Sequence, residues 1–196
     1  EAQAKRFGMK PLEGDVTKVD FSKRPFGVTV GDEEVLGETL VIATGATAML
    51  LGLESESQLM GHGVSACATC DGFFYKDQEI AVVGGGDTAM EEAVFLSKFA
   101  TKVTVVHRRD ELRASKIMQQ RAMDNPKVEF AWNSVITEII GSQDGGVTAV
   151  LLKDTQTGKI REAPTQGVFM AIGHRPNTGV FAGALDMDDE GYIVTV

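Results

Sequence analysis

Cys67 and Cys70 are the only two cysteines of this 196-residue chain, and two residues separate them. This spacing closes a small reversible disulfide, and in a reducing compartment such a pair is more often catalytic or metal-binding than structural. A thiol at a helix start is stabilised as thiolate, which makes it a better nucleophile and a better leaving group. Asp71 follows directly and could exchange a proton with a sulfur. These three residues are the candidate catalytic group.

A zinc half-site and an inert buried pair are the alternatives for the two cysteines. Tetrahedral zinc needs four ligands, or three and a water molecule. The chain has no second cysteine pair, and the nearest further donor is His62, five residues before Cys67. We therefore expect no metal site here, and both alternatives remain to be tested.

A glycine-rich segment stands between a predicted strand at 80–83 and a predicted helix at about 88–99. Glycines let the backbone turn off the strand and approach a pyrophosphate, and the free N–H groups and dipole of the helix favour phosphate. A small residue at Ala89 lets the helix pack closely on the sheet. An ordinary glycine turn is the alternative. In this strand–helix context the segment predicts dinucleotide binding, with candidate residues Gly84, Gly86, Asp87, Thr88 and Ala89.

A basic segment follows the next predicted strand, at 103–106, and bears on which nucleotide binds. An NAD site would place Asp or Glu there to hold the ribose 2′-hydroxyl. This chain has arginines instead, and guanidinium groups bind a 2′-phosphate through paired charge-assisted hydrogen bonds. A solvated basic helix face is the alternative. The segment favours NADPH, with candidate residues His107, Arg108, Arg109 and Arg113.

The predicted elements alternate strand–helix–strand–helix in the middle of the chain, which is typical of a parallel α/β sheet. The second of these helices is expected at about 112–123. The run 40–43 is continuously apolar and predicts a strand covered on both faces, whereas 49–66 predicts a loop. Further strands are expected at 16–21, 26–30, 128–132, 135–140, 147–152 and 167–173.

Composition excludes several classes of partner. The 19 basic and 28 acidic residues give a formal charge of −9, which would repel nucleic acid and anionic lipid. No apolar run approaches the ~20 residues of a membrane helix, and no signal peptide is visible. We therefore expect a cytoplasmic protein with neither a nucleic acid nor a membrane as its partner. The chain does not begin with Met, and residues 191–196 resemble an interrupted strand, so we expect a fragment of a longer protein.

Four motifs together resemble the low-molecular-weight thioredoxin reductases: 67–72, 84–89, 107–113 and 171–178. The resemblance covers essentially the whole chain in order. It implies an α/β fold in which a Rossmann-like NADPH domain with a parallel βαβ sheet is inserted in an FAD-binding domain of the same general class. It assigns 1–48 and 172–196 to a partial FAD domain, and 49–171 to the NADPH domain with the redox site. It also adds candidate cofactor residues: Thr44, Gly45, Ala46, Ile172 and Gly173.

The resemblance further implies that electrons pass from NADPH through FAD and the Cys67–Cys70 disulfide to thioredoxin. Cys70 would be the flavin-proximal sulfur, Cys67 would attack the thioredoxin disulfide, and Asp71 would donate or accept the proton. A homodimer is implied, as is a rotation of the NADPH domain about connecting strands near 47–51 and 170–174.

Two other FAD motifs of this family would lie before the first residue and after the last one of this sequence. We therefore expect an incomplete FAD site in this chain. Two other functions remain open from the sequence: a non-catalytic NADPH-binding module, and a related flavin disulfide oxidoreductase that acts on another disulfide partner.

Overall fold

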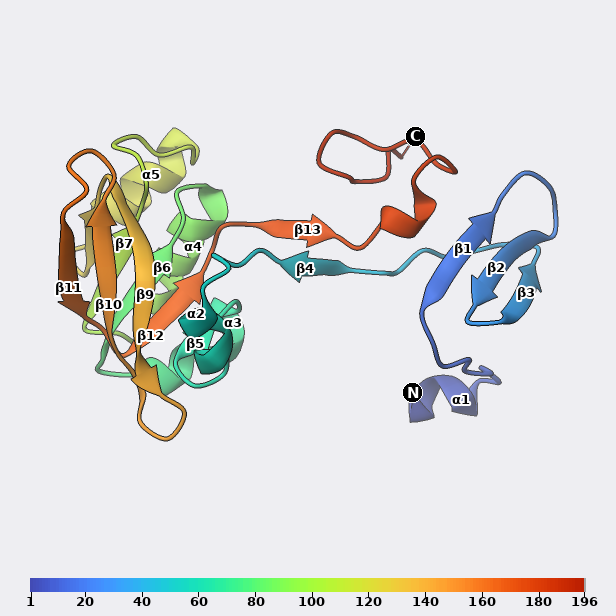
Figure 1. The fold of residues 1–196 in the computed structure, drawn as a ribbon, viewed down its shortest axis with the longest axis horizontal. Coiled ribbons are helices and arrows are strands. Elements are labelled where there is room, and N and C mark those ends of the chain that lie inside the picture. The colour runs from blue at the N-terminus through green and yellow to red at the C-terminus, as the bar shows by residue number, and fades with distance from the viewer. Residues whose placement is uncertain (196) are drawn as a thin grey trace. The chain divides into compact units, whose positions relative to one another are not determined.

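The computed structural model describes residues 1–195, which divide into two compact units (Figure 1). The first unit consists of Glu1–Thr47 and the segment that begins at Arg175, and the second consists of Ala48–His174. No helix among residues 1–195 combines the length and apolar character needed to span a membrane.

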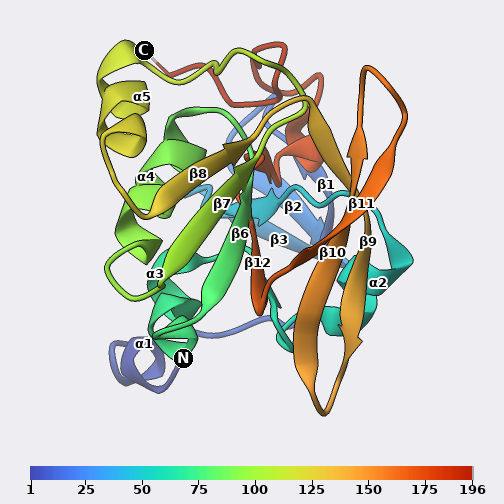
Figure 2. The same ribbon diagram turned by 90° about the vertical axis from the view of Figure 1, so that its left-hand side faces the viewer.

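The second unit is built on a five-stranded parallel sheet, so the predicted α/β class is confirmed. Helices α4 (Asp87–Leu96) and α5 (Lys116–Met123) cover one face, and strands β9 to β11 lie on the other face (Figure 2). The α5 helix begins four residues later than predicted. The sheet order is β5 (Val64–Ser65), β12 (Gly167–Met170), β6 (Glu79–Val83), β7 (Lys102–Val106) and β8 (Val128–Ala131).

Both faces of the parallel sheet are buried. Ile80 and Val82 of β6 pack in a core cluster with Leu96 of α4, while Ala81 and Val83 pack in a second cluster with β9 and β10. Successive side chains of a strand point to opposite faces, and a strand covered on both faces is apolar throughout. The two clusters explain why 80–83 forms a continuous apolar run.

The second face is covered by an antiparallel sheet of β9 (Ser134–Ser142), β10 (Gly146–Asp154) and β11 (Ile160–Pro164). The predictions at 135–140 and 147–152 correspond to β9 and β10. Strand β11 was not predicted, because its pattern of exposed and half-buried residues gives no apolar run.

The prediction of a loop over 49–66 is wrong, because this stretch contains helix α2 (Glu54–Leu59) and strand β5. The Glu56 side chain is fully buried, and its carboxylate accepts hydrogen bonds from the N–H groups of Leu51 and Gly52 at 2.9 and 2.8 Å. A carboxylate in the first turn satisfies N–H groups at a helix start. The polar run that predicted a loop therefore begins a helix. After β5 come the short helix α3 (Ala68–Asp71) and the 3-10 turn η1 (Gly72–Tyr75).

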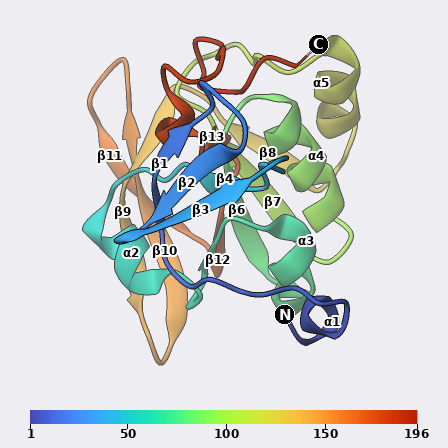
Figure 3. The ribbon, with the colours of Figure 1, turned by 90° about the vertical axis from the view of Figure 1, so that its right-hand side faces the viewer.

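The first unit contains an antiparallel meander of β1 (Val16–Asp20), β2 (Phe26–Val30) and β3 (Glu33–Gly37), shown in Figure 3. It also holds the short helix α1 (Ala2–Arg6) and the 3-10 turn η2 (Gly179–Phe181), whose Phe181 ring stacks on Phe21 at 6.3 Å. The prediction of a doubly covered strand at 40–43 is wrong. Within residues 1–195 no strand pairs with this segment, and Val41 is 88% exposed.

Two segments join the units, and they pair as the strands β4 (Ala46–Ala48) and β13 (His174–Pro176). Beyond this pair, the Met49 N–H donates to the Gly173 carbonyl at 2.9 Å, and the Asn177 N–H donates to the Gly45 carbonyl at 3.0 Å. Of the interrupted strand expected at 191–196, Ile193 forms an isolated bridge with Met187, and Val196 lies outside the described residues.

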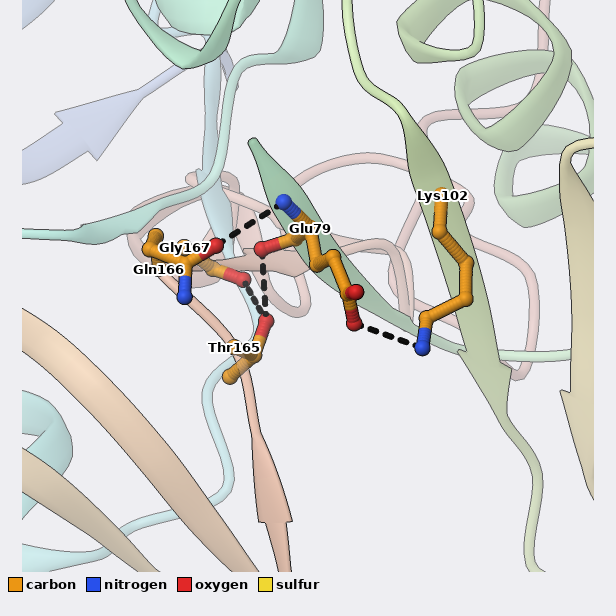
Figure 4. A network of polar contacts seen from close by, with 5 residues as sticks. All are labelled: Glu79, Lys102, Thr165, Gln166 and Gly167. Carbon is orange, nitrogen blue, oxygen red and sulfur yellow. Dashed lines mark hydrogen bonds and ion pairs between the residues drawn. The ribbon is translucent and has the colours of Figure 1, made fainter. Parts of the chain in front are cut away.

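The amino-terminal edge of the parallel sheet carries a polar network (Figure 4). The Glu79 carbonyl accepts hydrogen bonds from the Gln166 N–H at 2.8 Å and the Thr165 hydroxyl at 3.1 Å. The Glu79 N–H donates to the Gln166 side chain, and the Glu79 carboxylate pairs with Lys102. The network joins the start of β6 to the starts of β7 and β12.

Candidate active site

A pocket of about 490 Å³ opens at the carboxyl-terminal edge of the parallel sheet, entirely within the second unit. Its walls come from the segments that follow β6, β7 and β12, and from residues next to β4 and in β9. In open α/β sheets, ligands bind beyond the carboxyl ends of the strands. The predicted site residues that line it are Gly84, Gly86, Thr88, His107, Arg108, Arg109, Arg113, Ile172 and Gly173.

The turn from β6 to α4 uses its glycines in different ways. Gly84 has φ +152°, and a Cβ there would lie 2.3 Å from the Ala171 carbonyl oxygen and 2.8 Å from the Ala89 Cβ. A Cβ at Gly86 would meet nothing within 4 Å. Gly84 is thus required by the fold. Gly86 leaves free space in front of α4, where a ligand can approach the protein backbone.

The His107 ring packs against this turn. A Cβ at Gly85 would lie 2.2 Å from the His107 ring, which is only 7% exposed and whose Nε2 lies 3.0 Å from the Glu111 carbonyl. Burial lowers the pKa of His107. Although the histidine lines the pocket, its ring is a neutral packing group at pH 7, so the positive charge of this wall comes from the arginines.

The basic segment is hydrogen bonded to the glycine turn through its backbone. The Gly85 carbonyl accepts the N–H groups of Arg113 and Ala114 at 2.8 and 3.0 Å. One oxygen of Asp87 accepts both the N–H and the hydroxyl of Ser115, at 2.7 and 2.9 Å. Asp87 does not line the pocket, and Ala89 is buried behind it. These two predicted cofactor residues therefore shape the site from outside the pocket.

Three guanidinium groups give the pocket a positively charged wall. Arg108, Arg109 and Arg113 are exposed, and all three line the pocket. The ion pairs found among residues 1–195 are Lys5–Glu1 and Lys102–Glu79, so no carboxylate there neutralises these arginines. Such groups bind phosphate through paired, charge-assisted hydrogen bonds.

An apolar wall completes the pocket, and only part of it was predicted from the sequence. Ile172 and Gly173 were predicted, whereas Met49, Leu51 and Ile136 were not. The missed residues belong to segments far from the glycine turn in sequence, and no local pattern marks them. An apolar lining with a few placed charged groups is typical of a small-molecule or cofactor site.

The two cysteines form a disulfide with an S–S distance of 2.03 Å. Cys67 precedes α3, and its sulfur accepts the Cys70 N–H at 3.2 Å; Cys70 is exposed and Cys67 half-buried. The sulfurs are bonded to each other, and His62, the third ligand of the zinc alternative, contacts the Gln143 carbonyl at 2.9 Å. Within the described chain, no three His, Cys, Asp or Glu residues gather as metal ligands.

Asp71 lies one residue after the disulfide, and a buried serine holds it. The Ser65 hydroxyl donates to Asp71 Oδ2 at 2.6 Å and accepts the Cys67 N–H at 3.0 Å. Ser65 was not predicted, since a single serine in a short strand carries no sequence signal. Burial and the Asp71 charge raise the pKa of Tyr75, which ends the 3-10 turn η1.

The predicted residues Thr44, Gly45 and Ala46 lie in the first unit and do not line the pocket. All three are exposed, and Gly45 has φ +68°. The Asn177 side chain donates to the Thr44 carbonyl at 3.1 Å. The segment is thus exposed in this chain, and its backbone is hydrogen bonded to Asn177.

Comparison with known proteins finds similar sequences that match nearly the whole chain. A family model described as pyridine nucleotide-disulphide oxidoreductase matches residues 3–195. A thioredoxin reductase of Streptomyces clavuligerus is 53% identical over 193 residues, which cover 98% of this chain and 59% of that protein. A thioredoxin reductase of Rickettsia felis is 51% identical over 195 residues, or 98% of this chain and 63% of the relative.

Solved structures agree with these relatives. A thioredoxin reductase from Streptococcus pyogenes superposes with a TM-score of 0.86 at 42% identity, covering 100% of this chain and 63% of that one. One from Giardia duodenalis gives a TM-score of 0.86 at 42% identity, over 97% of this chain and 62% of that one. The chain therefore spans about three fifths of the length of the relatives that it matches.

Proposed function

The chain belongs to the pyridine nucleotide-disulphide oxidoreductase family, and we propose that it is part of a thioredoxin reductase that transfers electrons from NADPH, through FAD and the Cys67–Cys70 disulfide, to thioredoxin. One observation carries this proposal. A nucleotide-sized pocket with three unneutralised arginines and a cysteine disulfide occur in the same compact unit. The bound nucleotide and the cysteine pair would be the first electron donor and the last electron carrier within the protein, and FAD would connect them.

NADPH fits the pocket chemically. We propose that its pyrophosphate lies against the open backbone at Gly86 and the start of α4, where N–H groups and the helix dipole favour anions. Arg108, Arg109 and Arg113 would hold the 2′-phosphate. The apolar wall of Met49, Leu51, Ile136 and Ile172 would exclude water from the remainder of the nucleotide. On this proposal, residues 49–171 form the NADPH domain.

For FAD, the chain offers part of a site. We assign residues 1–48 and 172–196 to the FAD domain, with the exposed backbone of Thr44–Ala46 as a flavin-nucleotide contact. A Cβ at Gly45 would meet nothing within 4 Å, so this backbone is open to a ligand. Among the described residues of the first unit, no helix follows a glycine turn after a strand. Because the chain covers 59% and 63% of two thioredoxin reductases that it matches, we assign the remaining FAD contacts to the parts of those relatives that it does not cover. When bound there, FAD would supply the two-electron relay between NADPH and the disulfide.

The dithiol step requires only two cysteines and a proton carrier. Once the pair is reduced, the Cys67 thiolate attacks one sulfur of the thioredoxin disulfide and forms a mixed disulfide, and the released thioredoxin sulfur takes a proton. The Cys70 thiolate then attacks the Cys67 sulfur, which restores the Cys67–Cys70 bond and releases the second thioredoxin thiol. Two electrons and two protons have moved to thioredoxin: the first proton comes from solvent, and the second passes from the Cys70 thiol through Asp71 to the leaving sulfur.

The exposure of the cysteines bears on how thioredoxin gains access. Cys67, the proposed attacking sulfur, is here the less exposed of the pair. We propose that rotation of the NADPH domain about β4 and β13 presents it to the partner. Phe73 and Phe74 follow the disulfide and are 67% and 74% exposed, which provides apolar surface for docking. We further propose that the whole protein is a cytoplasmic homodimer.

Serine substitutions of the cysteines in the full-length protein test the proposed function. We expect Cys67→Ser and Cys70→Ser to abolish thioredoxin reduction while NADPH still bleaches the bound flavin in an anaerobic stopped-flow experiment. Thr157→Ala, at an exposed position in the turn between β10 and β11, is the control and should retain turnover. A serine variant that reduces thioredoxin at the wild-type rate would refute the proposal.

A further inference from the structure

We propose that Ser65 is a positioning residue of the redox site, which holds the Asp71 carboxylate and the Cys67 backbone in register for proton and sulfur transfer. This inference rests on the proposed dithiol function. Neither the sequence pattern nor the chemistry of a cysteine pair assigns a role to this serine.

The geometry places the Ser65 hydroxyl at the junction of the two reacting groups. Its Oγ donates to Asp71 Oδ2 at 2.6 Å and accepts the Cys67 N–H at 3.0 Å. A hydrogen bond to an ionised carboxylate is short and roughly twice as strong as a neutral one. One hydroxyl therefore connects the acid to the backbone of the cysteine that begins the redox motif.

Ser65 is itself held rigidly. It is 4% exposed and lies in β5, where it pairs with Phe169 of the central strand β12. Because the hydroxyl is buried, water cannot easily take its place when it is removed. The parallel sheet thus fixes Ser65, and Ser65 in turn fixes the loop that carries the cysteines.

This arrangement leaves one carboxylate oxygen for chemistry. Ser65 occupies Oδ2 of Asp71, and within residues 1–195 no other hydrogen bond to this carboxylate is found. Oδ1 is then the atom that can exchange a proton with a sulfur. At the same time the fixed Cys67 backbone keeps its sulfur where the Cys70 N–H donates to it at 3.2 Å.

Other ionisable groups surround the site without replacing Ser65. Tyr75 of η1 has its pKa raised by burial and by the Asp71 charge, so it stays neutral at pH 7. Helix α4, which packs against α3, carries Glu91 and Glu92, and burial together with the Glu91 charge raises the pKa of Glu92 to about 7. None of these groups is hydrogen bonded to Asp71 in the described chain.

A double-mutant cycle in the full-length protein tests the inference. We expect Ser65→Ala to lower kcat for thioredoxin reduction by about 10-fold or more, because misplaced reacting groups lose that much rate. NADPH-dependent flavin reduction should be unchanged. In an Asp71→Asn background, Ser65→Ala should slow turnover less than it does in the wild type, because the bond to the charged carboxylate is already lost and mainly the Cys67 N–H contact remains to be removed. Ser65→Thr, which keeps the hydroxyl, should recover most of the rate.

The outcomes separate positioning from a merely structural role. If Ser65→Ala slows turnover equally in the wild-type and Asp71→Asn backgrounds, or does not slow it at all, the inference fails. A wild-type protein that does not reduce thioredoxin would instead overturn the proposed function.

The inference can also be tested without a partner protein, by the rate at which iodoacetamide alkylates the reduced cysteines at different pH values. The pH at which the alkylation rate reaches half of its maximum should shift in Ser65→Ala, and it should return to the wild-type value in Ser65→Thr. An unshifted midpoint contradicts the inference whatever the partner is.

Discussion

The two edges of the parallel sheet are made by the same strands but have opposite chemistry. At the amino-terminal edge, Glu79 satisfies its backbone and side chain with Thr165, Gln166 and Lys102 (Figure 4). At the carboxyl-terminal edge, the arginines beyond β7 have no carboxylate partner among the described residues, and Gly86 faces open space. The first edge therefore contributes to stability. At the second edge, charged side chains and open backbone take no part in holding the fold together, so they are available to a ligand.

Substitution of the two glycines separates these roles within a single turn. Gly84→Ala places a Cβ 2.3 Å from the Ala171 carbonyl at φ +152°, so we expect a loss of about 3 kcal/mol in the free energy of unfolding. Gly86→Ala meets no protein atom, and we expect unfolding within about 1 kcal/mol of wild type but much weaker nucleotide binding. Urea titration and calorimetry measure the two effects. Equal loss of stability in both variants would contradict the assignment.

Thr165→Val probes the amino-terminal edge. It removes a buried hydroxyl whose oxygen lies 3.1 Å from both the Glu79 and the Gly167 carbonyl oxygens, between which its single proton is shared. We expect a loss of about 1–2 kcal/mol in unfolding free energy, because those carbonyls lose a partner. NADPH affinity should stay at the wild-type value. A clear fall in affinity would show that the two edges are not independent.

The smallest expected effect concerns Glu92, on the helix that follows the glycine turn. Burial and the neighbouring Glu91 charge raise its pKa to about 7, and its Oε2 is buried without a partner among the described residues. The folded protein therefore holds this proton more tightly than the unfolded chain, in which the carboxyl titrates at its ordinary pKa of 4.5. The resulting stability is fully present below pH 4.5 and is lost as pH rises through 7.

We accordingly expect Tm to fall between about pH 4.5 and pH 7 in the wild type, and to fall less in Glu92→Gln. Glu138→Gln, at an exposed position on β9, is the matched control and should keep the wild-type slope. If Glu92→Gln and the control show the same pH dependence, the buried carboxyl is not the cause.

Local patterns predicted the parts of the molecule that depend on neighbouring residues. The glycine turn, strands β6 and β7 and helix α4 follow from apolar periodicity and backbone freedom within about 30 residues. The arginine wall could also be predicted, because Arg108 and Arg109 follow shortly after the end of β7 in the sequence. The cysteine spacing likewise predicted a disulfide.

Features that depend on distant residues were missed or wrong. The run 40–43 is apolar, yet a strand also needs a neighbour to pair with, and the described residues offer none. Glu56 is polar but buried, because the N–H groups of Leu51 and Gly52 surround its carboxylate. The apolar wall at Met49 and Ile136, like the contact between Ser65 and Asp71, forms only once the sheet is assembled.

The central claim is that the carboxyl-terminal edge binds a 2′-phosphorylated nicotinamide nucleotide through its arginines, and its most direct test is calorimetric titration of the chain with NADPH and with NADH. Arg108→Ala combined with Arg109→Ala should weaken NADPH by about 100-fold, since charged hydrogen bonds are lost, and should change NADH by no more than about threefold. Lys102→Ala, which removes a positive charge at the amino-terminal edge, should leave both affinities unchanged. Equal weakening of NADPH and NADH in the arginine variant would contradict the account.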